Sequence, residues 1–271
     1  MPSANPKETY GLQGAEIKLS IGNGGAGPTG ILRCLSEDYL ADRHKSFGIA
    51  WYQDISPDTL LQLKRNVIDV ALVYDPEQAE MAVNEGFASH YTLIFYDHFI
   101  IIGPRSNTAN LLATDTPEQA FIKIAEKGIE SAQEAFLSRD DHSGTNEKEK
   151  SLWLKVGLTP WSGNCLWYAK YHAFPQEALV YADRHFLYTL TDYGTWQSSL
   201  SLIKNAELYI KGGDVLLNPC FALLRKNPSE LALDFLAYLK SARGQNIIRN
   251  FGDDEYKHPF YTPASQPDFI E

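Results

Sequence analysis

The stretch IKLSIGNGGAGPTG at Ile17–Gly30 combines a strand pattern, a glycine-rich loop and a helix start. Residues 17–21 alternate apolar and polar side chains, which is typical of a β-strand. Gly22–Gly27, called the glycine loop from here on, follows directly. Pro28 suits the first turn of a helix, because its nitrogen has no hydrogen to leave unpaired. A strand, a glycine-rich turn and a helix in this order are typical of an α/β unit.

The segments that follow continue the alternation of strand and helix. Apolar residues recur at helical spacing after Pro28, and strands are predicted at 48–52 and 67–74. The first of these strands precedes a helix with Ser56 as its N-cap, and the second precedes a helix over Pro76–Glu85. The order β-α-β-α-β-α predicts a parallel sheet with helices on both faces.

Two breaks divide the chain into lobes. The strand-like apolar pattern ends at Gly103-Pro104, where a polar segment begins. The pattern of strands and helices is interrupted again at Gly212-Gly213. We therefore expect a discontinuous first lobe at 15–103 and 213–271, an inserted second lobe at 104–212, and a loose N-terminal leader at 1–14. The inserted lobe is predicted to contain a helix opened by a capping box at Thr116, a helix at 175–185 and a strand at 188–192.

Composition excludes several classes of protein. The 271 residues carry 34 acidic and 24 basic side chains, a net charge of −10. A duplex-binding protein needs a cationic surface, so we expect no nucleic-acid partner. The seven histidines and three cysteines show no metal-ligand spacing, so neither a metal nor a cofactor is expected.

The first residues and the longest apolar run are the features from which we predict the cellular compartment. Residues 1–8 lack the apolar core of a secretory signal, and the longest apolar run, at 91–103, is too short to span a bilayer. The sequence as written is therefore expected to be cytoplasmic. The alternative is a periplasmic or extracellular protein from which a signal peptide has been removed.

The glycine loop is open to three interpretations. Gly22, Gly24 and Gly27 satisfy G-x-G-x-x-G between a strand and a helix, and Asp54 after the second strand would be the ribose carboxylate of a dinucleotide site. The same loop offers backbone N–H groups at a helix start to any small anion. The third interpretation is a tight turn that needs positive φ. The loop alone does not select a ligand.

A second candidate site is Ser138–Thr145, which reads SRDDHSGT and is called the arginine loop below. Arg139 offers a planar fork of donors, Ser143 and Thr145 offer hydroxyl groups, and Gly144 frees the backbone at a helix start. The alternatives are a surface ion pair between Arg139 and a neighbouring aspartate, and ordinary N-capping by the hydroxyl residues.

The arginine loop resembles the S-R-G-D-x-S-G-T-H segment of bacterial tungstate-binding proteins, the solute-binding components of oxyanion importers. Further matches keep their order from about residue 15 to 263; they are Val70–Pro76, Tyr96–Pro104, Tyr188–Thr195, Leu216–Pro219, and Ser241–Gln245 with Phe251-Gly252. The resemblance implies a type II periplasmic-binding-protein fold, in which two α/β lobes close on an anion at the hinge. It also implies that Arg139, Ser143 and Thr145 bind the ligand from the inserted lobe.

The sequence departs from this family at three positions. Bacterial relatives carry a hydroxyl-rich T-T-T-S-type loop where this chain has Gly22–Gly25. Backbone N–H groups and the Asn23 amide would then replace hydroxyl donors. Asp140 stands at the family's glycine after the arginine, and Asn146 stands at its final histidine. The chain is thus interpreted as a divergent member with an altered first ligand loop.

The leading prediction is a monomeric, non-enzymatic protein that binds a small oxyanion such as tungstate or molybdate between two lobes. Each lobe is expected to be a mixed sheet flanked by helices, and a membrane transporter is the partner if the protein is exported. No catalytic residue is predicted. The predicted ligand-binding residues are Asn23, Gly24, Gly25, Arg139, Ser143, Gly144 and Thr145. Two alternatives remain, namely the same fold recruited as an enzyme or carrier for a larger organic substrate, and an NAD(P)-dependent oxidoreductase.

Overall fold

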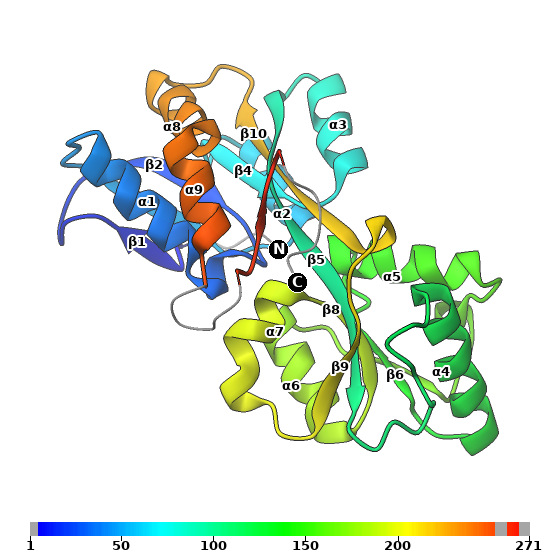
Figure 1. The fold of residues 1–271 in the computed structure, drawn as a ribbon. Helices are drawn as coiled ribbons and strands as arrows, with labels where there is room; N and C mark the ends of the chain where they lie inside the picture. Colours follow the sequence, from blue (N-terminus) through cyan, green and yellow to red (C-terminus); the bar gives the residue numbers. More distant parts are fainter. Residues whose placement is uncertain (1–4, 253–258, 266–271) are drawn as a thin grey trace. The chain divides into compact units, whose positions relative to one another are not determined.

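The chain forms two compact units in a computed structural model that describes residues 5–252 and 259–265. The first unit is Met1–Asp97 with Pro219–Glu271, and the second is His98–Asn218. Strands β5 (Ala88–Pro104) and β10 (Leu217–Arg225) run from one unit into the other (Figure 1). The unit boundaries therefore fall inside these strands, whereas the sequence-based boundaries stood at 103/104 and 212/213. Residues 1–4, 253–258 and 266–271, assigned above to the leader and the first lobe, lie outside the described residues.

The sheet of the first unit is mixed. Its inner strands β3 (Gly48–Tyr52), β2 (Ile17–Gly22) and β4 (Val70–Val73) are parallel, as the β-α-β pattern predicted. Strands β1 (Glu8–Tyr10) and β10 add to them in antiparallel orientation. The short strand β11 (Thr262–Pro263) pairs with β5.

Part of the predicted leader is ordered structure. Strand β1 pairs with β3, and the side chain of Tyr10 is only 2% exposed. The expectation of a loose leader is wrong for these residues, because the aromatic ring of Tyr10 joins the core and the edge of β3 satisfies the backbone of β1.

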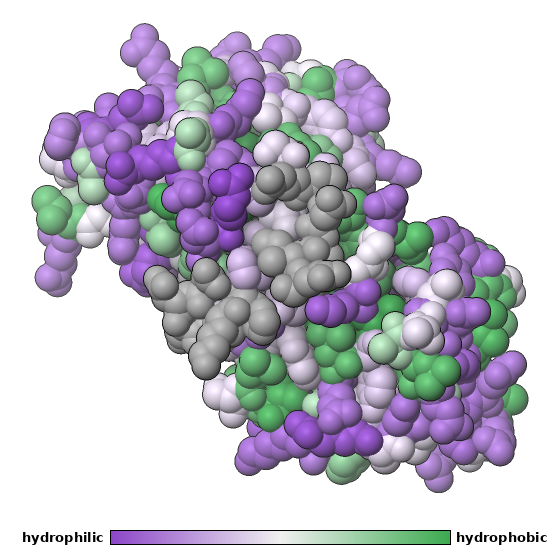
Figure 2. Space-filling model, viewed as in Figure 1, coloured by the Kyte–Doolittle hydropathy of each residue, from purple (hydrophilic) through white to green (hydrophobic). Residues whose placement is uncertain are grey.

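Helices cover both faces of the first sheet (Figure 1). On β4, Val70 and Leu72 pack with α1 (Ile31–Asp42), α8 (Glu230–Lys240) and α9 (Ala242–Asn250). The alternate residues Ala71 and Val73 pack with α2 (Ser56–Lys64) and α3 (Pro76–Asn84). This alternation is the two-residue period of a strand that is buried on both faces. The outward surface over α1, α8 and α9 is mainly hydrophilic in Figure 2.

One helix start in this unit differs from the prediction. Ser56 was predicted to be the N-cap of α2, but the cap residue is Ile55 and Ser56 is already helical. Asp75 caps α3 as its spacing before Pro76 suggests, since its carboxylate accepts hydrogen bonds from two backbone N–H groups of the first turn.

The second unit has a mixed sheet of its own. Strands β8 (Tyr188–Asp192), β6 (Phe136–Ser138) and β7 (Tyr168–Lys170) are parallel, and β5 is antiparallel to both β8 and β9 (Ala206–Ile210). Its aromatic core joins the sheet to α4 (Pro117–Ser131) and α5 (Gly144–Lys155). Helices α6 (Pro175–His185) and α7 (Tyr193–Ser199) contact β8. The predicted capping box at Thr116 is confirmed.

The fold therefore confirms the predicted mixed α/β class. Short 3-10 helices complete the described chain at Gly27–Thr29, Pro160–Ser162, Leu200–Leu202 and Asp214–Leu216.

The glycine loop follows β2 and the arginine loop follows β6. Each loop therefore lies at the carboxyl end of a parallel strand, where α/β proteins commonly bind ligands. Among the described helices, none has the length and apolar character that crossing a membrane requires.

Candidate functional site

Close packing explains the glycines of the first loop. A Cβ atom at Gly27 would lie 1.8 Å from the Trp51 ring, one at Gly24 would lie 2.7 Å from the carbonyl oxygen of Asp54, and one at Gly22 would lie 2.6 Å from an isoleucine side chain. None of these glycines has a positive φ. The tight-turn interpretation is therefore wrong, and the G-x-G-x-x-G spacing follows from the packing of the backbone against β3 and its neighbours.

Asn23 holds the glycine loop together. Its side chain is fully buried, its Nδ2 donates to the carbonyl of Leu72 at 3.0 Å, and its Oδ1 accepts from the N–H of Gly27 at 3.1 Å. Its carbonyl accepts from the Trp51 indole at 2.9 Å. The prediction that the Asn23 amide binds the ligand is thus replaced by a scaffolding role. The sequence could not show this, because Leu72 comes from another strand.

The backbone of the same loop offers unused donors. Within the part of the chain that the structure describes, the N–H groups of Gly24, Gly25 and Ala26 donate to no acceptor, and both glycines are partly exposed. Asp54, the carboxylate of the oxidoreductase alternative, is 5% exposed and accepts from Gln62 at 2.7 Å. The loop therefore presents N–H donors, and Asp54 is engaged within its own unit.

Arg139 is a buried cation at the start of the arginine loop. The residue is 6% exposed; its Nε donates to the carbonyl of Ala173 at 2.9 Å, and one terminal nitrogen, Nη2, contacts Asp141 at 2.5 Å. Burial lowers the pKa of Arg139, and the charges of Asp141 and Asp192 act in the opposite direction. The guanidinium stays protonated, because an arginine side chain does not lose its proton in proteins. Among the described residues, nothing accepts a hydrogen bond from its Nη1.

The first turn of α5 supplies further donors. Ser143 is the N-cap, and its Oγ accepts from the N–H of Asn146 at 3.4 Å, so the capping alternative holds for this residue. The N–H groups of Gly144 and Thr145 and the hydroxyl of Thr145 have no hydrogen-bond partner in the described chain. The positive end of the helix dipole adds to the attraction of these groups for an anion.

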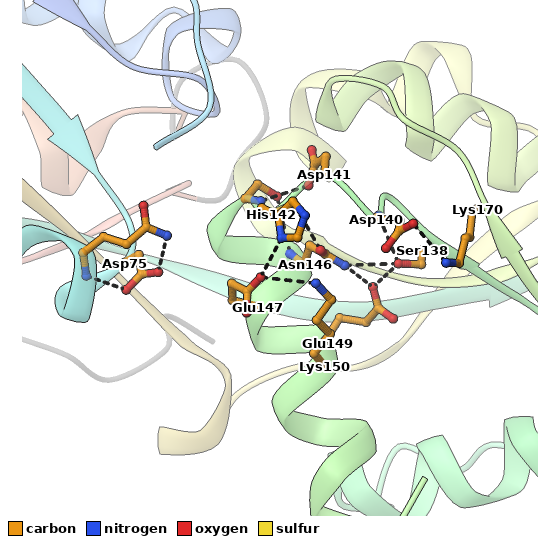
Figure 3. Close-up of polar contacts among 12 residues, drawn as sticks. Asp75, Ser138, Asp140, Asp141, His142, Asn146, Glu147, Glu149, Lys150 and Lys170 are labelled. Atoms are coloured by element: carbon orange, nitrogen blue, oxygen red, sulfur yellow. Dashed lines mark hydrogen bonds and ion pairs between the residues drawn. The ribbon is translucent and has the colours of Figure 1, made fainter. Parts of the chain in front are cut away.

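Asp140 occupies a backbone position that suits glycine. Its φ is +44°, in the left-handed region that aspartate tolerates better than most residues. Its carboxylate lies 3.1 Å from the Nζ of Lys170 (Figure 3). It also lies 3.7 Å from the Nε2 of His172. The replacement of the family's glycine by Asp140 is therefore sterically feasible, and its charge is paired with a lysine.

Two buried residues of α5, Asn146 and Glu149, were not among the predicted site residues. Asn146, at the position of the family's histidine, is fully buried, and its Oδ1 accepts from the N–H of His142 at 3.1 Å. Glu149 is 2% exposed and hydrogen-bonded to Asn146. The sequence offered one signal for this pair, because residues three positions apart lie next to each other on the same face of a helix. In the described residues, no group of three or more His, Cys, Asp or Glu could hold a metal ion.

Comparison with known proteins identifies relatives over most of the chain. The model of the PBP superfamily domain matches residues 18–243. The tungstate-binding protein TupA of Peptoclostridium acidaminophilum is 32% identical over 205 residues, which are 72% of this chain and 68% of that protein. A Haloferax volcanii protein, named as a candidate anion-binding protein of an ABC transporter, is 30% identical over 193 residues. That alignment covers 68% of this chain and 54% of the relative, so the chain spans about half of its length.

A solved structure shows the same fold. It is described as a periplasmic protein that is a candidate for metal binding, and it is 34% identical with a TM-score of 0.84. The match covers 95% of this chain and 99% of that chain. The type II periplasmic-binding-protein fold is thus confirmed, and with it the resemblance to tungstate-binding proteins. The chain belongs to the PBP superfamily of periplasmic binding proteins.

Proposed function

We propose that this protein binds a small oxyanion of the tungstate or molybdate type, without chemical conversion, at the arginine loop. The observation that carries the proposal is the arginine loop itself. Arg139 Nη1, the N–H groups of Gly144 and Thr145, and the Thr145 hydroxyl are four donor groups without an acceptor in the described chain, all within seven residues.

The chemistry of these groups suits a fully ionised tetrahedral anion. Tungstate and molybdate at neutral pH present four oxygen acceptors and no proton to donate, so a site of donors matches them. Both carboxylates of the loop already have partners, because Asp140 pairs with Lys170 and Asp141 accepts from Arg139 and from the N–H of Ser143. The net charge of −10 acts at long range, whereas these donors act within a few ångströms.

We also propose that the glycine loop takes part in anion binding through the N–H groups of Gly24 and Gly25, which donate to no acceptor among the described residues. Exclusion of water from such donors lowers the local dielectric and strengthens each hydrogen bond to a charged ligand.

The proposed setting is an exported protein that delivers its ligand to an ABC-type membrane transporter. The name of the Haloferax volcanii relative supports the transporter, and the periplasmic description of the solved structure supports export. The expectation of a cytoplasmic protein finds no support among these relatives, and the periplasmic or extracellular alternative takes its place.

Isothermal titration with tungstate, molybdate, sulfate and phosphate tests the binding proposal. Arg139→Ala removes one charge-assisted hydrogen bond, worth about 1.5–3 kcal/mol, so tungstate affinity should fall about 10- to 100-fold. Arg105→Ala is the matched control, because Arg105 is an exposed arginine of the same unit that pairs with Glu207 at 3.3 Å. A wild-type protein that binds none of the four anions, or an Arg139→Ala variant with unchanged affinity, contradicts the proposal.

A further inference from the structure

A buried carboxylate lies beneath the arginine loop. One oxygen of Glu149 accepts from Ser138 Oγ at 2.5 Å and from Asn146 Nδ2 at 3.2 Å, and the other accepts from Trp153 Nε1 at 3.0 Å and from the Tyr168 hydroxyl at 2.6 Å. Figure 3 shows the contacts of this carboxylate with Ser138 and Asn146. The carboxylate thus faces four hydrogen-bond donors.

The donors on the Ser138 side have fixed directions. Ser138 Oγ already accepts from the N–H of Asp140 at 3.1 Å and from Asn146 Nδ2 at 3.2 Å, so both of its lone pairs are used and its proton points to Glu149. The amide of Asn146 is oriented by its Oδ1, which accepts from the N–H of His142. On the other oxygen the indole of Trp153 can only donate. An ionised Glu149 carboxylate can therefore accept from all four groups at once.

The network extends to the backbone of the arginine loop. The two N–H groups that it holds belong to Asp140 and His142, on either side of Asp141. Both residues have positive φ, +44° and +59°, in the left-handed region that is uncommon for non-glycine residues. Glu149 therefore acts at a distance of two hydrogen bonds on the segment that carries Arg139.

We propose that Glu149 is a positioning residue for oxyanion binding. Its ionised carboxylate fixes Ser138 and Asn146, and these two side chains fix the backbone on either side of Asp141. The ligand does not touch Glu149. This inference rests on the proposed function for its effect on affinity, but its effect on the loop is independent of any ligand.

Amide hydrogen exchange of the full chain at pH 8, without ligand, tests the effect on the loop. In Glu149→Gln the amides of Asp140 and His142 should exchange at least tenfold faster than in the wild type, while amides of β8 keep their protection. A purely structural role would accelerate exchange throughout the unit. Glu130→Gln is the matched control, since that carboxylate lies on the surface of α4 and pairs only with Lys127 among the described residues. Unchanged protection of the two loop amides overturns the proposal.

Titration of the same proteins with tungstate tests the effect on binding. Glu149→Gln should weaken tungstate affinity at least tenfold, and Glu130→Gln should leave it unchanged. Ser138→Ala removes the hydroxyl that links Glu149 to the Asp140 amide, so it should accelerate exchange at Asp140 and weaken tungstate affinity if Glu149→Gln does not fold. Faster exchange with unchanged affinity overturns the positioning role. A wild-type protein that binds no oxyanion refutes the proposed function, while the exchange result still decides whether Glu149 holds the loop.

Discussion

Two buried titratable residues of the second unit give the folding stability of the protein a specific dependence on pH. Glu149 and His98 are each 2% exposed. Burial raises the pKa of Glu149 from 4.5 to about 7, although its four hydrogen bonds act in the opposite direction. Burial lowers the pKa of His98 from 6.5 to about 4. The two groups therefore respond to pH with opposite signs.

The sign of each effect follows from which state binds the proton. Between pH 4.5 and 7 the folded protein holds the Glu149 proton and the unfolded chain has lost it, so the free energy of unfolding falls as the pH rises. Between pH 4 and 6.5 the unfolded chain protonates His98 and the folded protein does not, so the free energy of unfolding rises with pH. Over the shared window of about two pH units, each effect amounts to about 3 kcal/mol, and the two offset one another.

Glu149→Gln removes one side of this balance. The free energy of unfolding of the variant should rise by about 3 kcal/mol relative to that of the wild type between pH 4.5 and 6.5, because only the His98 effect remains. Contributions from other carboxylates are common to both proteins and cancel in the comparison.

Urea unfolding at several pH values in this window measures the difference. Tryptophan fluorescence is a suitable signal, since four of the five tryptophans lie in the second unit, namely Trp153, Trp161, Trp167 and Trp196. A difference between the two proteins that stays constant within about 1 kcal/mol across the window would refute the assignment of Glu149 as a group with a raised pKa.

Two further predictions concern the glycine loop. Asn23→Ala leaves the Gly27 N–H and the Leu72 carbonyl without their partner, so urea unfolding should show a loss of about 2–4 kcal/mol, and a loss below 1 kcal/mol would contradict the scaffolding role. Gly25→Ser adds a Cβ atom 3.6 Å from a tyrosine ring and should leave the melting temperature within about 2 °C, whereas Gly24→Ser adds one 2.7 Å from a backbone oxygen and should lower it by several degrees. Equal melting temperatures for the two serine variants would argue against the packing explanation.

The predictable part of the fold is local. Helix α6 begins at Pro175 and ends at His185 as predicted, because a proline in its first turn and a helical pattern of apolar residues both lie in the sequence. Strand β8 has its predicted bounds, Tyr188–Asp192. In this segment large side chains alternate with the β-branched threonines, a two-residue period that is typical of a strand. The glycine loop and the arginine loop could be singled out because each joins a strand to a helix start.

The remainder depends on partners from distant segments. Asn23 looks like an exposed loop donor until Leu72 from β4 receives its amide. In the sequence Glu149 is an ordinary polar residue of a helix. Its burial depends on Tyr168 from β7, whose hydroxyl donates to its carboxylate. Strand β9, with its exposed Glu207, lacks a continuous apolar pattern and forms only because β5 offers an edge. These contacts join residues that are close only in the folded chain.

Crystals grown with tungstate test the central claim most directly, because the tungsten position is measured by anomalous scattering. The account predicts a single tungsten peak whose oxygens lie within hydrogen-bond distance of Arg139 Nη1 and the N–H groups of Gly144 and Thr145. A peak away from the arginine loop, or a structure without tungsten at saturating tungstate, would contradict the account.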